Sequence, residues 1–300
     1  MSQIQLEDYS SSIQLNEKFL PNKTLQNSTE HIVDDLINML LQEPNAPAEV
    51  RLPDTYNEKR NLLRSLLNIR EPKPLTDQLI KKIDTLLQIE LKNKGIVKIE
   101  KLESIATMFP NCSYSNSDNF YLWQGDITQL NTDAIVNAAN NQMLGCFQPL
   151  HACIDNAIHS AAGPQLRNDC ETIMSIQKEL ENTGHAKITR AYNLPSRYVL
   201  HTVGPIVPQG TPLTDKQKSE LASCYIKCLE LAQKMGNIKS IAFCAISTGV
   251  FGFPKKEAAN IAISTVNHWL LTHPNKFEKI VFNVFSDSDW MEYVKVFNKV

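Results

Sequence analysis

The sequence predicts an α/β protein: a three-layer α/β/α arrangement around a mostly parallel mixed sheet, preceded by an all-helical N-terminal extension. Two observations lead to this fold class. From about residue 120 onward, short apolar runs alternate with helix-length amphipathic segments, whereas residues 31 to about 92 show helical patterns alone. We therefore expect a polar, loosely packed N-terminal arm over residues 1–30, a helical extension over 31–112 and an α/β domain over 113–300.

The extension is expected to contain three helices, because its apolar residues recur at helical spacing. The first spans 31–43 and the second 54–70, and each is followed by prolines that end a helix. Thr76 is a suitable N-cap for the third. A short strand is expected within 96–102. We find no constellation typical of catalysis in this region and interpret it as an accessory layer.

The elements of the α/β domain follow from the same patterns. Strands are expected at 120–125, 133–136, 239–246 and 279–285, with two more inside 186–203. Helices are expected at 150–161, from 164, at 214–235, at 255–271 and from 287. Such apolar strands separated by helices are typical of parallel sheets buried on both faces.

Composition restricts the classes of function. The chain has 30 Lys and Arg against 32 Asp and Glu, which argues against a nucleic-acid-binding protein. Its apolar runs are too short to span a bilayer, and its N-terminus lacks the pattern of a signal peptide. We therefore expect a cytoplasmic protein without membrane contact. The oligomeric state is left open, with a monomer as the working expectation.

The seven cysteines are an odd number with irregular spacing, which argues against a disulfide framework. Five of them are interpreted as structural thiols, namely Cys112, Cys170, Cys224, Cys228 and Cys244. Cys146 and Cys153 differ because His151 lies between them. Two thiolates and an imidazole with an open fourth position are typical of catalytic zinc. The spacing alone leaves zinc and coincidental clustering equally open.

Three other segments carry polar or glycine-rich patterns at predicted strand ends. In Ser247–Pro254, Gly249 and Gly252 let backbone amides approach an anion beside a helix N-terminus, although an ordinary turn explains the glycines equally well. Asp126 either caps a turn or accepts a hydrogen bond from a ligand amine. Three asparagines within 137–141 suit sugar hydroxyls, because amide side chains both donate and accept.

Together these segments resemble the macrodomain family, which binds ADP-ribose. The matching segments are GDIT (125–128), AIVNAAN (134–140), the IH-AAG run (158–163), LHTVGP (200–205) and STGVFGFP (247–254), in the order of the family. Where common hydrolytic macrodomains carry a run of glycines, this chain has GCFQPLHACID (145–155). That departure resembles the zinc-containing subfamily that reverses mono-ADP-ribosylation, and LLRSLLNIREP (62–72) resembles the N-terminal extension of that subfamily.

The resemblance implies a set of substrate-binding residues. Asp126 and Ile127 are expected at the adenine, with Phe285 packed against it, and the diphosphate is expected at Ser247, Thr248, Gly249, Val250, Phe251 and Gly252. Asn137 and Asn140 are expected toward the distal ribose, which Phe251 also approaches. Asp155 occupies the position of the family's helix-borne acidic residue, and Ile154 is a further expected substrate-binding residue. It further implies that Cys146, His151 and Cys153 hold Zn²⁺ against that ribose. Asp155 and Asn140 are the expected catalytic residues.

The implied function is a zinc-dependent hydrolase that removes mono-ADP-ribose from modified protein side chains, with Asp- and Glu-linked ADP-ribose as the expected substrate. Two alternatives use the same residues: a reader that binds ADP-ribose around a structural zinc, and a hydrolase of small derivatives such as O-acetyl-ADP-ribose. Zinc either activates water or orients the ribose, and its neutralisation by two thiolates slightly favours orientation. Asp155 either positions the water or deprotonates it.

Overall fold

The computed structural model describes residues 3–22 and 28–298. At its centre is a six-stranded sheet with the order β2-β8-β7-β4-β6-β5. These strands are β2 (Phe120–Gln124), β8 (Lys279–Val284), β7 (Ser240–Phe243), β4 (Ala134–Ala139), β6 (Tyr198–Val203) and β5 (Ala186–Arg190). All neighbouring pairs are parallel except β5 and β6, so the predicted mostly parallel mixed sheet is confirmed.

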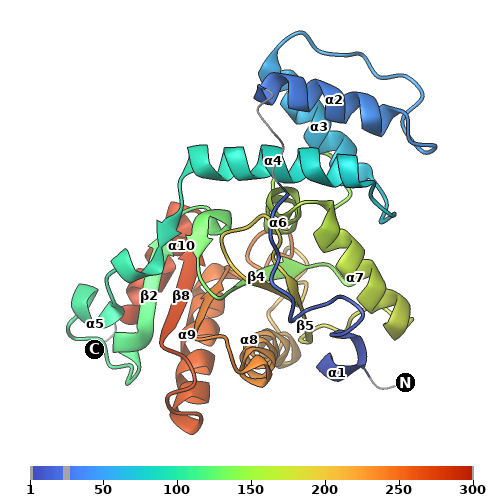
Figure 1. Ribbon diagram of the computed structural model, residues 1–300. Helices are drawn as coiled ribbons and strands as arrows, with labels where there is room; N and C mark the ends of the chain where they lie inside the picture. The colour runs from blue at the N-terminus through green and yellow to red at the C-terminus, as the bar shows by residue number, and fades with distance from the viewer. Residues whose placement is uncertain (1–2, 23–27, 299–300) are drawn as a thin grey trace.

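Helices cover both faces of the sheet. On one side lie α8 (Asp215–Met235), α9 (Lys255–Thr272) and α10 (Asp287–Phe297), and on the other lie α6 (Ile154–Ala162) and α7 (Pro164–Gln177) (Figure 1). Because helices pack on both faces of the sheet, β6 and β7 are buried along their whole length. No helix within the described ranges is both long and apolar enough to cross a membrane.

Three elements of the α/β domain differ in length from their predictions. The strand expected at 133–136 is β4, which runs from Ala134 to Ala139. The helix expected at 150–161 begins at Ile154, and Cys153 is its N-cap, with Sγ accepting from the Asn156 amide at 3.4 Å. The cause is Leu150, whose φ of 55° lies outside the right-handed helical region. The strand expected at 239–246 ends at Phe243, after which the chain turns toward the Ser247 loop.

The three predicted helices of the extension are confirmed as α2 (Thr29–Leu41), α3 (Tyr56–Ile69) and α4 (Asp77–Lys94). Each has a side-chain N-cap, and Thr76 caps α4 as expected. Their leucines and isoleucines form a hydrophobic core separate from that of the sheet. Smaller elements complete the chain: α1 (Leu6–Tyr9), β1 (Val97–Lys98) paired with β3 (Leu130–Asn131), α5 (Ile105–Met108), and the 3₁₀ turns Ile99–Lys101, Ser117–Asn119 and Ile127–Gln129.

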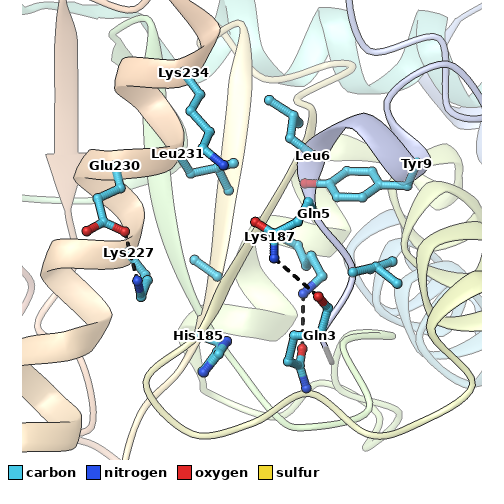
Figure 2. Close-up of a pocket in the computed structure, with 12 residues that line it drawn as sticks. Gln3, Gln5, Leu6, Tyr9, His185, Lys187, Lys227, Glu230, Leu231 and Lys234 are labelled. Atoms are coloured by element: carbon cyan, nitrogen blue, oxygen red, sulfur yellow. Dashed lines mark hydrogen bonds and ion pairs between the residues drawn. The ribbon is translucent and has the colours of Figure 1, made fainter. Parts of the chain in front are cut away.

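The expectation of a loosely packed arm over residues 1–30 is wrong for residues 3–22. Tyr9, Ile13 and Leu15 are each at most 2% exposed and belong to the main core, whereas Leu20 is exposed. The segment borders a small pocket against β5 and α8, in which Gln3 accepts a hydrogen bond from Lys187 at 3.3 Å (Figure 2). Residues 1–2 and 23–27 lie outside the described part of the chain.

A buried carboxylate joins the extension to the α/β domain. Asp84, on α4, has no exposed surface, and its Oδ1 accepts from Gln165 Nε2 and Asn193 Nδ2, each at 2.8 Å. Its other oxygen accepts from the Asn22 amide at 3.2 Å. Because buried polar groups are costly when unpaired, these contacts fix how α4 sits on the domain.

We expect Asp84→Ala to lower the free energy of unfolding by about 3 kcal/mol, because it leaves two buried amide donors without an acceptor. The measurement is urea unfolding followed by circular dichroism. Asp77→Ala is the matched control, since Asp77 is an exposed aspartate on the same helix. Equal losses in the two variants would contradict the assigned role of Asp84.

Candidate functional site

Four adjacent parallel strands deliver the predicted site residues to one edge of the sheet. Asp126 follows β2, Phe285 follows β8, the Ser247 loop follows β7, and Asn140 follows β4. Parallel strands have their carboxyl ends at the same edge, which is where α/β sheets bind ligands. The residues therefore line this edge in the spatial order of the strands, which differs from their order in the sequence.

At one end of the row, Asp126 has two different sets of partners. Its Oδ1 accepts from the Thr128 amide at 3.0 Å and the Thr128 hydroxyl at 2.7 Å, which caps the turn that begins at Ile127. Its Oδ2 accepts from Lys94, at the end of α4. Burial alone would raise the pKa of Asp126, but the hydrogen bonds from Lys94 and Thr128 lower it below its ordinary value. The carboxylate of Asp126 therefore stays ionised, with its Oδ2 facing Lys94 of the extension.

Phe285 lies beside Asp126 because β2 and β8 are paired, with Gln124 opposite Val284. Its side chain is 79% exposed, which is unusual for an aromatic ring. The backbone below is fixed by Asn283, whose Nδ2 donates to the Gly125 carbonyl at 3.0 Å. The arrangement presents an aromatic face beside a carboxylate, and this combination suits a flat base that carries an amine.

The loop after β7 exposes backbone amides. The amides of Gly249, Val250 and Phe251 have no acceptor within the described residues, and the loop leads into the N-terminus of α9. Gly252 makes the shape possible: its φ is 68°, and a Cβ there would lie 2.7 Å from the Val207 carbonyl oxygen. Free amides at a helix N-terminus form a site for an anion such as a phosphate.

Beyond this loop, Asn137 and Asn140 hold the carboxylate of Asp155. Asn137 Nδ2 donates to Asp155 Oδ1 at 2.8 Å, and Asn140 Nδ2 lies 3.4 Å from Asp155 Oδ2. Asn137 has no exposed surface, so its role at this edge of the sheet is to orient Asp155. Asn140 is half-buried. Burial raises the pKa of Asp155 to about 6 despite the hydrogen bond from Asn137.

A layer of neutral histidines lies beneath Asp155. His159 Nε2 is 3.5 Å from Asp155 Oδ1, and His201 Nδ1 is 3.2 Å from Asn137 Nδ2. Burial lowers the pKa of both histidines, so both rings are uncharged at neutral pH. His159, Cys170 and His201 also form a cluster of possible ligand atoms, but all three are buried, and Thr189 already pairs with His201 at 2.9 Å. We interpret this cluster as the floor of the site.

Cys146, His151 and Cys153 do come together, as the sequence predicts. Cys146 Sγ lies 3.6 Å from His151 Nδ1, and the ligand atoms of the three residues are all within 4.8 Å of one another. All three side chains are half-buried beside Asp155, which lies two residues beyond Cys153. Burial, with the neighbouring Cys146 thiol, raises the pKa of Cys153. Two sulfur donors and an imidazole fit Zn²⁺, and three protein ligands leave one position open.

The sequence interpretation missed the contribution of the extension to this site. Asn68 and Arg64, on α3, hydrogen-bond to the segment between Cys146 and Cys153 and to α6, and Lys94 pairs with Asp126. One signal was present: Arg64 and Asn68 are spaced i, i+4 and flank Leu66 and Leu67 in the second half of the helix. Two polar residues on one face indicate a polar contact, but the sequence does not name the partner.

Comparison with known proteins agrees with this geometry. A family model described as Macro domain matches residues 136–262. The Protein-ADP-ribose hydrolase of Treponema medium is 49% identical over 261 residues, which cover 87% of this chain and 96% of that protein. The Protein-ADP-ribose hydrolase of Staphylococcus aureus strain MRSA252 is 42% identical over 264 residues, which cover 88% and 94% respectively.

Solved structures give the same result. The Trypanosoma brucei macrodomain in complex with ADP-ribose is similar with a TM-score of 0.58 and 30% sequence identity. The match covers 81% of this chain and 96% of that chain. The likeness thus extends over nearly the whole length of each relative, and this chain belongs to the macro domain family.

Proposed function

We propose that this protein is a zinc-dependent hydrolase that removes mono-ADP-ribose from Asp and Glu side chains of modified proteins. The names of its relatives in Treponema medium and Staphylococcus aureus support the hydrolase activity. We further propose that it acts in the cytoplasm, where cysteine thiols stay reduced and available to a metal.

The order of the site along the sheet edge is the observation that carries this proposal. ADP-ribose is a linear molecule with adenine at one end, a diphosphate in the middle and a ribose at the other end. Asp126 and Phe285 suit the base, the free amides of 249–251 suit the diphosphate, and Asn140 and Asp155 suit the distal ribose. Three recognition elements therefore occur in the order in which one ligand would use them.

Hydrolysis adds one water across the bond between the distal ribose and the protein carboxyl, releasing ADP-ribose and the free side chain. Asp155 orients this water and accepts its proton, because it is a carboxylate held at the ribose end by two amide donors. Asn140 binds a ribose hydroxyl, while the loop amides hold the diphosphate in place. Binding the distant parts of ADP-ribose in this way fixes the reacting bond next to Asp155.

Cys146, His151 and Cys153 would hold the zinc ion. When bound there, zinc supplies Lewis acidity and a fixed contact point beside the distal ribose. The remaining work is done by the chain itself: Asp155 moves the proton, and the half-buried setting of the three ligands limits access of bulk water.

We expect Cys153→Ala to weaken zinc binding on the order of 100-fold or more, because one of three ligands is lost. Zinc affinity is measured by competition with a chromophoric chelator. ADP-ribose release from a protein modified on Glu should fall in parallel, and chelation followed by zinc should remove and restore it. Cys112→Ala is the control, since Cys112 is a half-buried cysteine outside the site. Full release by zinc-free protein would exclude metal dependence.

We expect Asp155→Asn to lower kcat for ADP-ribose release by roughly 10² to 10⁴, the usual contribution of a general base. The affinity for free ADP-ribose should change little, because Asn keeps the shape of the side chain. Rates come from single-turnover assays and affinities from calorimetry. Asp169→Asn is the control, since Asp169 is a buried carboxylate on α7 outside the site. Tight binding by the unaltered chain with no release would instead indicate a reader.

We expect Gly252→Ala to weaken ADP-ribose binding about tenfold or more, because the new Cβ displaces the loop from the Val207 carbonyl. Calorimetric titration measures the change. Gly210→Ala is a close control: its φ is 78°, but a Cβ there meets nothing within 4 Å. The control isolates the steric contact from backbone strain. Equal affinity in both variants would argue against diphosphate binding by this loop.

A further inference from the structure

The segment that carries the three proposed zinc ligands has little regular structure of its own. Between Cys146 and Cys153, the backbone bonds are His151 N to the Gln148 carbonyl at 3.3 Å and Cys153 N to the His151 carbonyl at 3.0 Å. Leu150 has a left-handed φ of 55° and is 43% exposed. Because much of its side chain stays in water, burial of Leu150 offsets only part of the cost of this unfavourable backbone conformation. The conformation needs support from outside the segment.

That support comes from the extension. The backbone amide of Leu150 donates to Asn68 Oδ1 at 3.1 Å, across 82 positions of sequence. Asn68 lies on α3 and is 2% exposed, so this bond is shielded from water. Because Leu150 directly precedes His151, the bond fixes the backbone at the point where the chain turns the imidazole toward the two thiols.

Asn68 is itself held by a fully paired network. Its Oδ1 also accepts from Asn156 Nδ2 at 3.1 Å, and its Nδ2 donates to Ser160 Oγ at 3.2 Å. Asn156 Nδ2 reaches on to the Gln148 carbonyl at 3.1 Å, and Arg64 donates to Asn156 Oδ1 at 2.7 Å. The network therefore ties α3 to both α6 and the ligand-carrying segment.

The start of the segment is held by Arg167 of α7, which also donates to the Leu67 carbonyl on α3 at 3.0 Å. Arg167 Nε donates to the Leu144 carbonyl at 2.8 Å, and its guanidinium lies 4.4 Å from the centre of the Phe147 ring. Arg167 thus fixes the region of Cys146, whereas Asn68 fixes the half that leads to His151 and Cys153. Two anchors from different parts of the fold set the relative positions of the three ligands.

We propose that Asn68 is a positioning residue for the metal site: through the Leu150 amide it preorganises His151 and Cys153 to bind zinc. This inference rests on the proposed zinc site. It gives the helical extension a direct part in the chemistry of the α/β domain. A residue that orients ligands from behind typically changes metal affinity 10- to 100-fold.

The test compares the zinc affinity of the unaltered chain, Asn68→Ala, Asn68→Asp and Asn61→Ala, by chelator competition on the full-length protein. Asn68→Ala removes the acceptor, and we expect about tenfold or more weaker binding. Asn68→Asp keeps an oxygen for the Leu150 amide and should restore affinity close to that of the unaltered chain. Asn61 is an exposed asparagine on the same helix, so Asn61→Ala should leave affinity unchanged.

The unfolding temperature of each metal-free variant is measured alongside. If the role of Asn68 were merely structural, Asn68→Ala would lower the unfolding temperature, and Asn68→Asp would not restore zinc affinity. Should Asn68→Ala fail to fold, Asn68→Ser carries the same test, since its hydroxyl is too short to reach the Leu150 amide. Equal zinc affinity in Asn68→Ala and the unaltered chain would overturn this inference alone. Absence of zinc binding by the unaltered chain would overturn the metal site and this inference together.

Discussion

The parallel pairing of β2, β8, β7 and β4 is the constraint on which the site depends. Backbone hydrogen bonds hold these strands in one direction, so the loops after them emerge at the same edge. The pairing is buried on both faces, which makes a change of direction or register costly. Asp126 and Asn140 are thereby placed at opposite ends of one row, with the amide-rich loop between them.

The exclusion of water from the buried part of the site is a second constraint, and it explains why amide side chains surround Asp155. A carboxylate that is 5% exposed needs donors, and Asn137 and Asn140 provide them. The same desolvation keeps His159 and His201 neutral beneath it. The floor of the site is therefore uncharged, and the buried carboxylate of Asp155 lies above it, beside Cys146, His151 and Cys153.

The extension is more than a cover. It has a hydrophobic core of its own, and yet several of its polar side chains act across the boundary, among them Asp84 on α7, Asn68 on the segment between Cys146 and Cys153, and Lys94 on Asp126. The last two contacts lie near the two ends of the proposed ligand. A binding site of this kind is shared between the two parts of the chain.

The sequence alone determined the alternation of strands and helices, the three helices of the extension and the local motifs, because hydrophobic periodicity, caps and glycines act within a few residues. Cys146, His151 and Cys153 were also visible, since they fall within one short segment. The packing of Tyr9, the buried pairing of Asp84 and the bond from Asn68 to Leu150 were not. These contacts join residues tens of positions apart, and only the tertiary structure decides which polar groups must satisfy one another once water is excluded.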